Sequence, residues 1–333
     1  MSSKVSAAVP LSGSSARTVV YVSLLGDLLV AAMKFGAAVL TGSSAMFSEG
    51  VHSVVDALTE ITLLYGLASS RRRPTIDHQL GYGREIFFWN FIVALLIFAL
   101  GAGAAAYDGI RQIAMPSAVE NPVVSYAVLG AAFVAEALSL RYARRASDKV
   151  RNGRSLRTYL SETRDVTSLT VLFDGAAGLL GLVIAAAGTA LSQLFDDPVY
   201  DGIASVMIAT ILSLAAFVLA RQSKALLIGV PATPAAVRSI LQVAGDDLAV
   251  TAVNGSVTVH LAPEQLLVAL SIEFRRDLGT DDIETAVGDI VNRLRSSHPE
   301  VKDLFIKPQT AAGYAMSREL RYGTMVKPVP KSR

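Results

Sequence analysis

Long apolar segments alternate with short polar joints over the first two thirds of the chain. Each of six segments reaches about 20 residues, the length that an α-helix needs to cross the hydrocarbon core of a bilayer. The joints are polar or contain Gly and Pro, which end helices. The pattern predicts six membrane-spanning helices, at residues 19–41, 44–68, 86–112, 123–143, 166–194 and 199–220.

Basic residues lie in only two of the joints between these segments. Lysine and arginine are enriched on the cytoplasmic side of membrane proteins, so the bias predicts that both termini are cytoplasmic. The joint after the second segment holds Arg71, Arg72, Arg73 and Arg84, and the joint after the fourth holds Arg144, Arg145, Lys149, Arg151, Arg154, Arg157 and Arg164.

After about residue 225 the pattern becomes that of a small soluble domain. TPAAVRSILQVAG and DDIETAVGDIVNRLRSSH read as helices, and SVTVHL, LLVALSIEF and DLFIKP read as strands. The order helix–strand–strand–helix–strand predicts an α+β fold. We expect a disordered tail at residues 1–16, a transmembrane domain at 17–224, a cytoplasmic α+β domain at 225–310 and a basic disordered tail at 311–333.

Composition supports a polytopic α-helical membrane protein. Of 333 residues, 52% are hydrophobic and only 17% are charged, whereas soluble domains are about one quarter charged. The chain has no cysteine, which excludes disulfides and thiolate metal sites. It also lacks the HExxH motif of zinc proteases and any Arg-rich apolar helix, so a metalloprotease or a voltage sensor is disfavoured.

Ionisable residues inside the apolar segments are the candidate functional groups, because burying charge in a membrane is costly. His52 and Asp56 are four residues apart, so they share one face of a helix. A helix rise of ~1.5 Å places His52 roughly 12 Å and Asp56 roughly 18 Å from the outer side. Asp174 and Asp27 lie roughly 14 Å and 12 Å from the inner side. An imidazole with carboxylates at the midplane predicts a site for a divalent metal ion.

Several further polar residues have more than one interpretation. Thr170 lies four residues before Asp174 and could hold a metal-bound water or orient a carboxylate. Glu60 continues the stripe of His52 and could serve the inner exit path. Asp27 could instead pair with Lys34 on the same helix face, and Glu136 and Asp108 are interpreted as residues that stabilise helix packing.

Several long motifs make the chain resemble the cation diffusion facilitator family, from about Val20 to Pro308. They are TGSSAMFSEGVHSVVDALTE at 41–60, DHQLGYGREIFFWNFIVALLIFALGAG at 77–103, DVTSLTVLFDGAAGLLGLVIA at 165–185, SKALLIG at 223–229 and HLAPEQLLVALSIEF at 260–274. The resemblance implies a homodimer with a metallochaperone-like, ferredoxin-like cytoplasmic domain that exports Zn²⁺, Mn²⁺, Fe²⁺ or Co²⁺ in exchange for protons.

The resemblance also implies which residues bind the transported ion. His52, Asp56 and Asp174 match ligand positions of the family, whereas Thr170 stands where many relatives carry His or Asp. A small site of imidazole and carboxylates favours Zn²⁺, with Fe²⁺, Co²⁺ and Mn²⁺ as alternatives. His78, His260 and His298 are weaker cytoplasmic metal candidates; His78 is followed by Tyr82 where some relatives have a second histidine.

These inferences define the expected partners and the alternative function. We expect membrane lipids, a second copy of the chain, a divalent metal ion and protons as partners, with no permanent cofactor and no nucleic acid. The Ala- and Arg-rich composition of the chain fits a protein of a bacterial inner membrane. The alternative is a non-transporting family member that acts as a partner subunit or metal sensor, because Thr170 and Phe173 reduce the ligand set.

Overall fold

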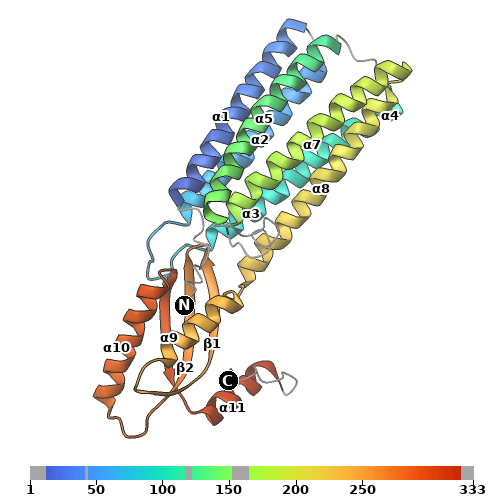
Figure 1. The fold of residues 1–333 in the computed structure, drawn as a ribbon. Coiled ribbons are helices and arrows are strands. Elements are labelled where there is room, and N and C mark those ends of the chain that lie inside the picture. Colours follow the sequence, from blue (N-terminus) through green and yellow to red (C-terminus); the bar gives the residue numbers. More distant parts are fainter. Residues whose placement is uncertain (1–12, 42–43, 117–121, 152–164, 324–333) are drawn as a thin grey trace. The chain divides into compact units, whose positions relative to one another are not determined.

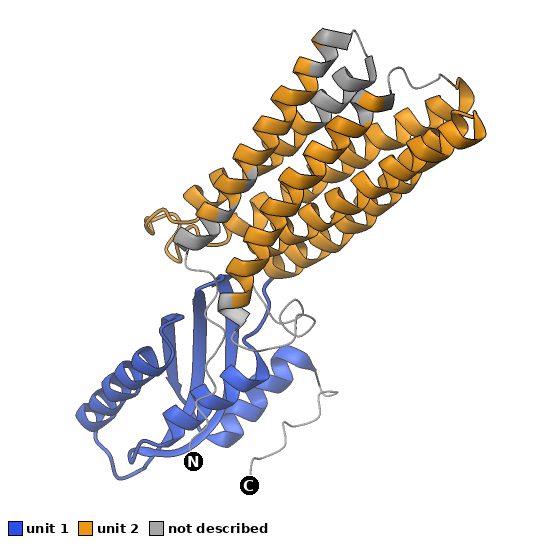
Figure 2. Ribbon diagram, turned by 45° about the horizontal axis from the view of Figure 1, so that its top comes forward, with its two compact units in different colours: residues 1–7, 229–333 blue, residues 8–228 orange. Residues whose placement is uncertain are grey.

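The structure, a computed structural model, describes residues 13–41, 44–116, 122–151 and 165–323, without the side chains of some residues within the helices. The described chain forms two compact units, coloured separately in Figure 2. One holds the helices up to Ile228, and the other begins at Gly229.

The first unit is a bundle of long helices that run side by side (Figure 1). Their sequences are rich in Ala and Leu, which favour helix. The helices are α1 (Gly13–Thr41), α2 (Ser44–Ser69), α3 (Glu85–Leu96), η1 (Ile97–Ala102), α4 (Gly103–Ala114), α5 (Pro122–Arg151), α7 (Val166–Phe195) and α8 (Val199–Ile228).

Four helical stretches among the described residues are long and apolar enough to cross a membrane. They are Glu85–Ala114, Tyr126–Asp148, Val166–Phe195 and Val199–Ile228. These correspond to the last four segments predicted from the sequence. Helices α1 and α2 coincide with the first two, and their crossing of a membrane stays a prediction.

The third of the predicted segments contains a turn of π-helix. The helix continues from α3 through η1 into α4, so its backbone hydrogen bonds shift register at Ile97–Ala102. Beyond this turn, α4 crosses α8 at unusually close range. A Cβ atom added to Gly109 would lie 2.8 Å from the carbonyl oxygen of Gly202. Only glycines at both positions permit this contact.

The second unit is a small α+β fold whose order of elements confirms the predicted helix–strand–strand–helix–strand sequence. The elements are α9 (Pro234–Gly245), β1 (Val250–Ala262), β2 (Gln265–Phe274), α10 (Thr280–Ser297), β3 (Val301–Pro308) and α11 (Ala311–Tyr322). The sheet order is β1-β2-β3. Strands β1 and β2 pair antiparallel, with Ser256 opposite Leu270, and β2 pairs parallel with β3, with Leu266 opposite Val301.

The core of this unit lies between one face of the sheet and two helices. Alternate residues of β2, such as Val268 and Ile272, are fully buried, as the period of two in a strand requires. They pack against Ile240 of α9 and Ile290 of α10.

The structure differs from the predicted disordered tails at both ends. Residues 311–322 form helix α11 instead of a disordered segment, and Thr310 caps it by accepting a hydrogen bond from the amide of Gly313 at 3.2 Å. The polar composition of this stretch hid a Thr cap followed by good helix formers. Helix α1 begins at Gly13, within the predicted tail; residues 1–12 lie outside the described residues.

Candidate functional site

Carboxylates from four different helices interact inside the helical bundle. Glu136 of α5 interacts electrostatically with Asp27 of α1, Asp174 of α7 and Asp56 of α2. All four side chains are partly buried. Carboxyl groups that share apolar surroundings disfavour one another's ionised form unless a cation joins them. The arrangement is therefore suited to attract a positively charged substrate.

Two glycines of α7 make room for the side chain of Glu136. A Cβ atom added to Gly175 or to Gly178 would lie 3.2 Å from the Oε1 atom of Glu136. Both glycines lie within about one helical turn of Asp174. The small residues thus let the carboxylate of α5 lie against the helix that carries Asp174.

A buried lysine adds one positive charge to this acidic region. Lys34 of α1 is 5% exposed, and its Nζ atom donates a hydrogen bond of 2.9 Å to the hydroxyl of Ser53 in α2. It also interacts electrostatically with Glu136. Ser53 directly follows His52, so the ammonium lies beside the helix turn that carries the predicted ligand pair.

Thr170 is fully buried and is bound to a neighbouring helix. Its hydroxyl has one proton, which is shared between Oδ1 of Asn90 in α3 at 3.0 Å and the carbonyl oxygen of Val166 at 2.9 Å. Asn90 in turn donates to the hydroxyl of Thr167 at 3.2 Å. In this arrangement the proton of Thr170 is used in helix packing and does not orient a carboxylate.

The predicted ligands differ in how far the structure describes them. His52 lies in α2, but its side chain is outside the described side chains. Glu60 lies two turns further along the same helix and is 4% exposed. Among the described residues, no three His, Asp or Glu side chains form a group that could hold a metal ion.

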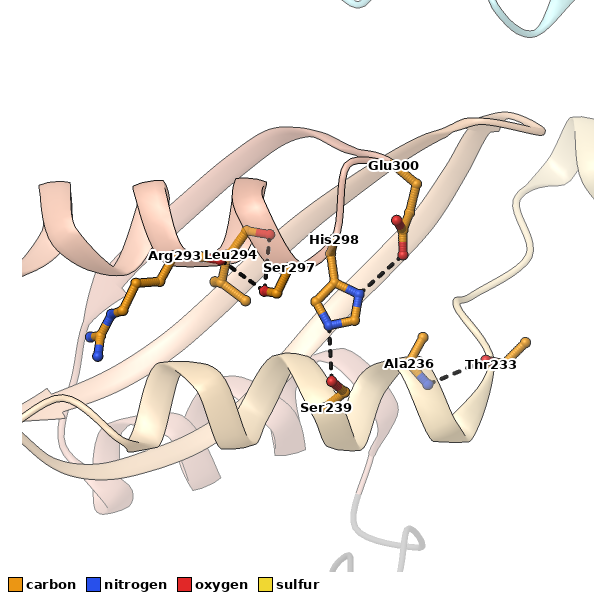
Figure 3. Close-up of polar contacts among 8 residues, drawn as sticks. All are labelled: Thr233, Ala236, Ser239, Arg293, Leu294, Ser297, His298 and Glu300. Atoms are coloured by element: carbon orange, nitrogen blue, oxygen red, sulfur yellow. Dashed lines mark hydrogen bonds and ion pairs between the residues drawn. The ribbon is translucent and has the colours of Figure 1, made fainter. Parts of the chain in front are cut away.

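The histidines of the second unit take part in hydrogen bonds of the fold. Nε2 of His298 lies 2.9 Å from the hydroxyl of Ser239, and Nδ1 lies 3.1 Å from Oε1 of Glu300 (Figure 3). The side chain of His260 lowers the pKa of Glu300 electrostatically. The backbone amide of His260 donates a hydrogen bond to the carbonyl oxygen of Val230. Burial raises the pKa of Glu300, but the hydrogen bond from His298, a backbone hydrogen bond and the charges of His298 and His260 together outweigh it and hold that pKa below its usual range.

His78 lies on the surface of the loop between α2 and α3. Its ring stacks on Tyr82 with centroids 4.5 Å apart, and its backbone amide donates to the hydroxyl of Thr75 at 3.2 Å. The ring that stacks on His78 belongs to a tyrosine, so this contact does not supply the second histidine that a metal site in the loop would use.

Two residues of the bundle were not identified as candidates from the sequence. Glu136 was interpreted as a packing residue, although it lies among the predicted carboxylates. The signal was its position near the middle of an apolar segment, where an ionisable residue is functional by default. Asn90 was not singled out; the signal was an amide within the apolar run FFWNFIV.

Several proteins similar to this chain are named for the tolerance, antiport or efflux of metal ions. Residues 20–228 match the family model described as the cation efflux transmembrane domain. Metal tolerance protein C4 of Arabidopsis thaliana is 35% identical over 61% of this chain and 45% of its own length. The proton-coupled zinc antiporter SLC30A9, mitochondrial, of Xenopus laevis is 30% identical over 76% of this chain and 46% of its own.

A bacterial relative is more distant. The manganese efflux system protein MneP of Bacillus subtilis (strain 168) is 26% identical over 58% of this chain and 62% of its own length. The chain spans about half the length of the first two relatives.

Proposed function

This chain belongs to the cation efflux family of metal transporters, the cation diffusion facilitators, and we propose that it exports Zn²⁺ from the cytosol in exchange for protons. It is an integral membrane protein, with helices of the length and apolarity that a bilayer requires. The proposed transport site consists of His52, Asp56 and Asp174.

The observation that carries this proposal is the convergence of carboxylates from separate helices. Asp56 on α2 and Asp174 on α7 both interact with Glu136 on α5 inside one apolar bundle. Isolated carboxylates are rare in such surroundings, and a converging set fits a substrate that is a cation.

Exchange with protons follows from the chemistry of the proposed ligands. A histidine that binds a metal must be neutral, and a carboxylate must be ionised, so metal ions and protons compete for the same atoms. An imidazole titrates near pH 6.5, within the physiological range. An ion that arrives from the cytosol displaces protons, and protons from the other side displace the ion once the site faces outward. Alternating access around a midplane site makes the exchange obligatory.

Zn²⁺ is the proposed substrate because imidazole and carboxylate ligands in a small site suit it. The relative in Xenopus laevis is described as a proton-coupled zinc antiporter, and the one in Bacillus subtilis as a manganese efflux protein. Fe²⁺, Co²⁺ and Mn²⁺ are the alternatives, because affinity order alone does not determine which metal a transporter carries.

The proposed setting is a homodimer in a bacterial inner membrane with both termini in the cytoplasm. The basic joints, with Arg71–Arg73 before α3, support this orientation by the positive-inside rule. The second unit, with its α+β core, would then lie in the cytoplasm as the metallochaperone-like dimerisation domain.

Flux measurements test the proposal. The purified full-length chain is reconstituted into liposomes that contain a metal-sensitive dye, and uptake of Zn²⁺, Mn²⁺, Fe²⁺ and Co²⁺ is followed with and without a pH gradient. We expect saturable Zn²⁺ uptake that accelerates when the lumen is acidic. Equal rates of uptake with and without the pH gradient would contradict proton exchange.

One observation favours the alternative of a partner subunit or metal sensor. The hydroxyl of Thr170 is bound to Asn90, so α7 offers one strong ligand, Asp174, where a pair is expected. A folded chain that moves none of the four ions alone, but regains flux when a second transporter of the family is added, would favour this alternative.

A further inference from the structure

The first turns of α7 carry an unusual set of buried polar side chains. Asp165 is 3% exposed, Thr167 1%, Ser168 4% and Thr170 2%, and Asn90 of α3 beside them is 1% exposed. Polar groups that leave water without hydrogen bonds destabilise a protein. Such a set is therefore stable only where its hydrogen bonds are satisfied.

The hydrogen bonds of Asn90 have a defined direction. A backbone carbonyl can only accept, so the amide nitrogen of Asn90 must face the carbonyl oxygen of Ile86, which lies 2.7 Å away. The second hydrogen on that nitrogen points to the hydroxyl of Thr167 at 3.2 Å. Oδ1 therefore faces Thr170, whose hydroxyl donates to it at 3.0 Å.

These contacts fix the rotation of α7 about its own axis. Thr167 and Thr170 lie three residues apart on one helix face, and Asn90 holds both. At the start of the helix, Oδ1 of Asp165 accepts from the amide of Ser168 at 3.1 Å, and Oδ2 accepts from its hydroxyl at 2.6 Å. Rotating or sliding α7 past α3 would break both bonds between Asn90 and the two threonines, whereas the bonds of Asp165 lie within α7 and only fix where this helix begins.

We propose that Asn90 is a positioning residue of the transport site, which holds α7 in the rotation that presents Asp174 to Asp56. The inference rests on the proposed function. Asp174 is one helical turn beyond Thr170, about 6 Å along the axis. A ligand displaced by roughly 1 Å binds its ion much less well. Asn90 acts on the ion only through α7 and need not touch it.

The test measures Zn²⁺ uptake by proteoliposomes as a function of Zn²⁺ concentration. Thr170→Val and Asn90→Leu remove the hydrogen bond with little change of volume, and each should raise the KM for Zn²⁺ about five- to tenfold. Thr189→Val is the matched control. Its hydroxyl donates to Asp201 of α8 at 3.3 Å, but it lies on α7 about 22 Å beyond Asp174, so its KM should stay within twofold of wild type.

A combined variant separates positioning from a loss of folding stability. Replacing every partner of a buried polar group by apolar residues of similar shape can leave stability almost unchanged. The triple variant Asn90→Leu, Thr167→Val, Thr170→Val should therefore regain the Tm of wild type while its KM stays five- to tenfold raised.

Each outcome distinguishes this inference from the proposed function. A triple variant with wild-type KM would overturn the inference, because the network would then serve only to satisfy its own buried groups. A fall in the maximal rate at unchanged KM would also overturn it, since that result would indicate that Asn90 lines the path of the ion and does not position its ligand. Absence of flux in wild-type protein would overturn the proposed function together with the inference.

Discussion

The ammonium of Lys34 in α1 donates a buried hydrogen bond of 2.9 Å to the hydroxyl of Ser53 in α2, the residue after His52. Lys34 also interacts with Glu136. It therefore supplies positive charge to the acidic region before any metal ion arrives, and it repels a cation that approaches the same carboxylates.

Replacing Lys34 by Met should lower the KM for Zn²⁺ and slow release. At the effective dielectric constant of a protein interior, the repulsion between two like charges several ångströms apart is about 1–2 kcal/mol. Removing this repulsion should lower the KM about tenfold. Concentration-dependent Zn²⁺ uptake into proteoliposomes measures the change. Ser53→Ala, which keeps the charge and removes only the acceptor, is the control; a KM that rises in Lys34→Met would contradict the counter-charge role.

Glu136 should contribute to attraction of the ion although it was interpreted from sequence as a packing residue. Its carboxylate lies against Gly175 and Gly178 and interacts with Asp174. Glu136→Gln preserves shape and removes the group that can ionise when a cation enters, and we expect uptake at low Zn²⁺ to fall about tenfold. Asp148→Asn, an exposed residue on the same helix, should leave uptake unchanged. Equal activity of the two variants would show that Glu136 does not act on the ion.

The close crossing of α4 and α8 should depend on glycine. In Gly109→Ala the new methyl group would lie 2.8 Å from the carbonyl oxygen of Gly202, and overpacking of this kind costs about 1–3 kcal/mol. A lower Tm of the detergent-solubilised protein is expected. Gly130→Ala is matched, because no atom lies within 4 Å of its added Cβ, and its Tm should be equal to or above that of wild type. Similar losses in both variants would contradict a tight crossing.

The stability of the second unit should decrease in acid because of Glu300. Its folded pKa is lowered, because the hydrogen bond from His298, a backbone hydrogen bond and the nearby histidine charges together outweigh burial. A lowered carboxylate pKa stabilises the fold above the unfolded pKa, and the contribution is lost as pH falls through the folded value, in a window that opens near the ordinary value of 4.5 and extends to lower pH.

Hydrogen exchange of α10 and β3 in the full-length protein measures this effect. Wild type should lose protection as the pH falls below 4.5, and Glu300→Gln should start less protected at about pH 6 and change less. A variant that loses as much protection on acidification as wild type would exclude Glu300 as the responsible group.

The long helices could be predicted from sequence because each apolar run is bounded by a cap or a breaker. Asp165 begins α7, and Gly229, with a φ of 123°, ends α8. α8 extends to Ile228, beyond the predicted end at residue 220, because no breaker stands between them. The π-turn at Ile97–Ala102 had no such signal, since shifts of hydrogen-bond register depend on packing between helices.

The candidate site could be predicted only in part. Helical spacing within one segment pairs His52 with Asp56, because both lie on one helix. The contacts of Asn90 with Thr170 and of Glu136 with the glycines of α7 join distant segments, and a single sequence carries no direct signal for such pairs. The sequence therefore predicted the helices themselves, but it did not predict which side chains of different helices are in contact.

The most direct test of the central claim compares Zn²⁺ uptake by wild type and by Asp174→Asn in proteoliposomes with an acidic lumen. The substitution preserves shape and removes one proposed ligand charge. Asp108→Asn, exposed on α4, serves as the matched control. We predict rapid uptake by wild type and by the control, and at least a hundredfold loss in Asp174→Asn, which corresponds to about 2.7 kcal/mol. Uptake by Asp174→Asn at the wild-type rate and KM would contradict the assignment of the transport site.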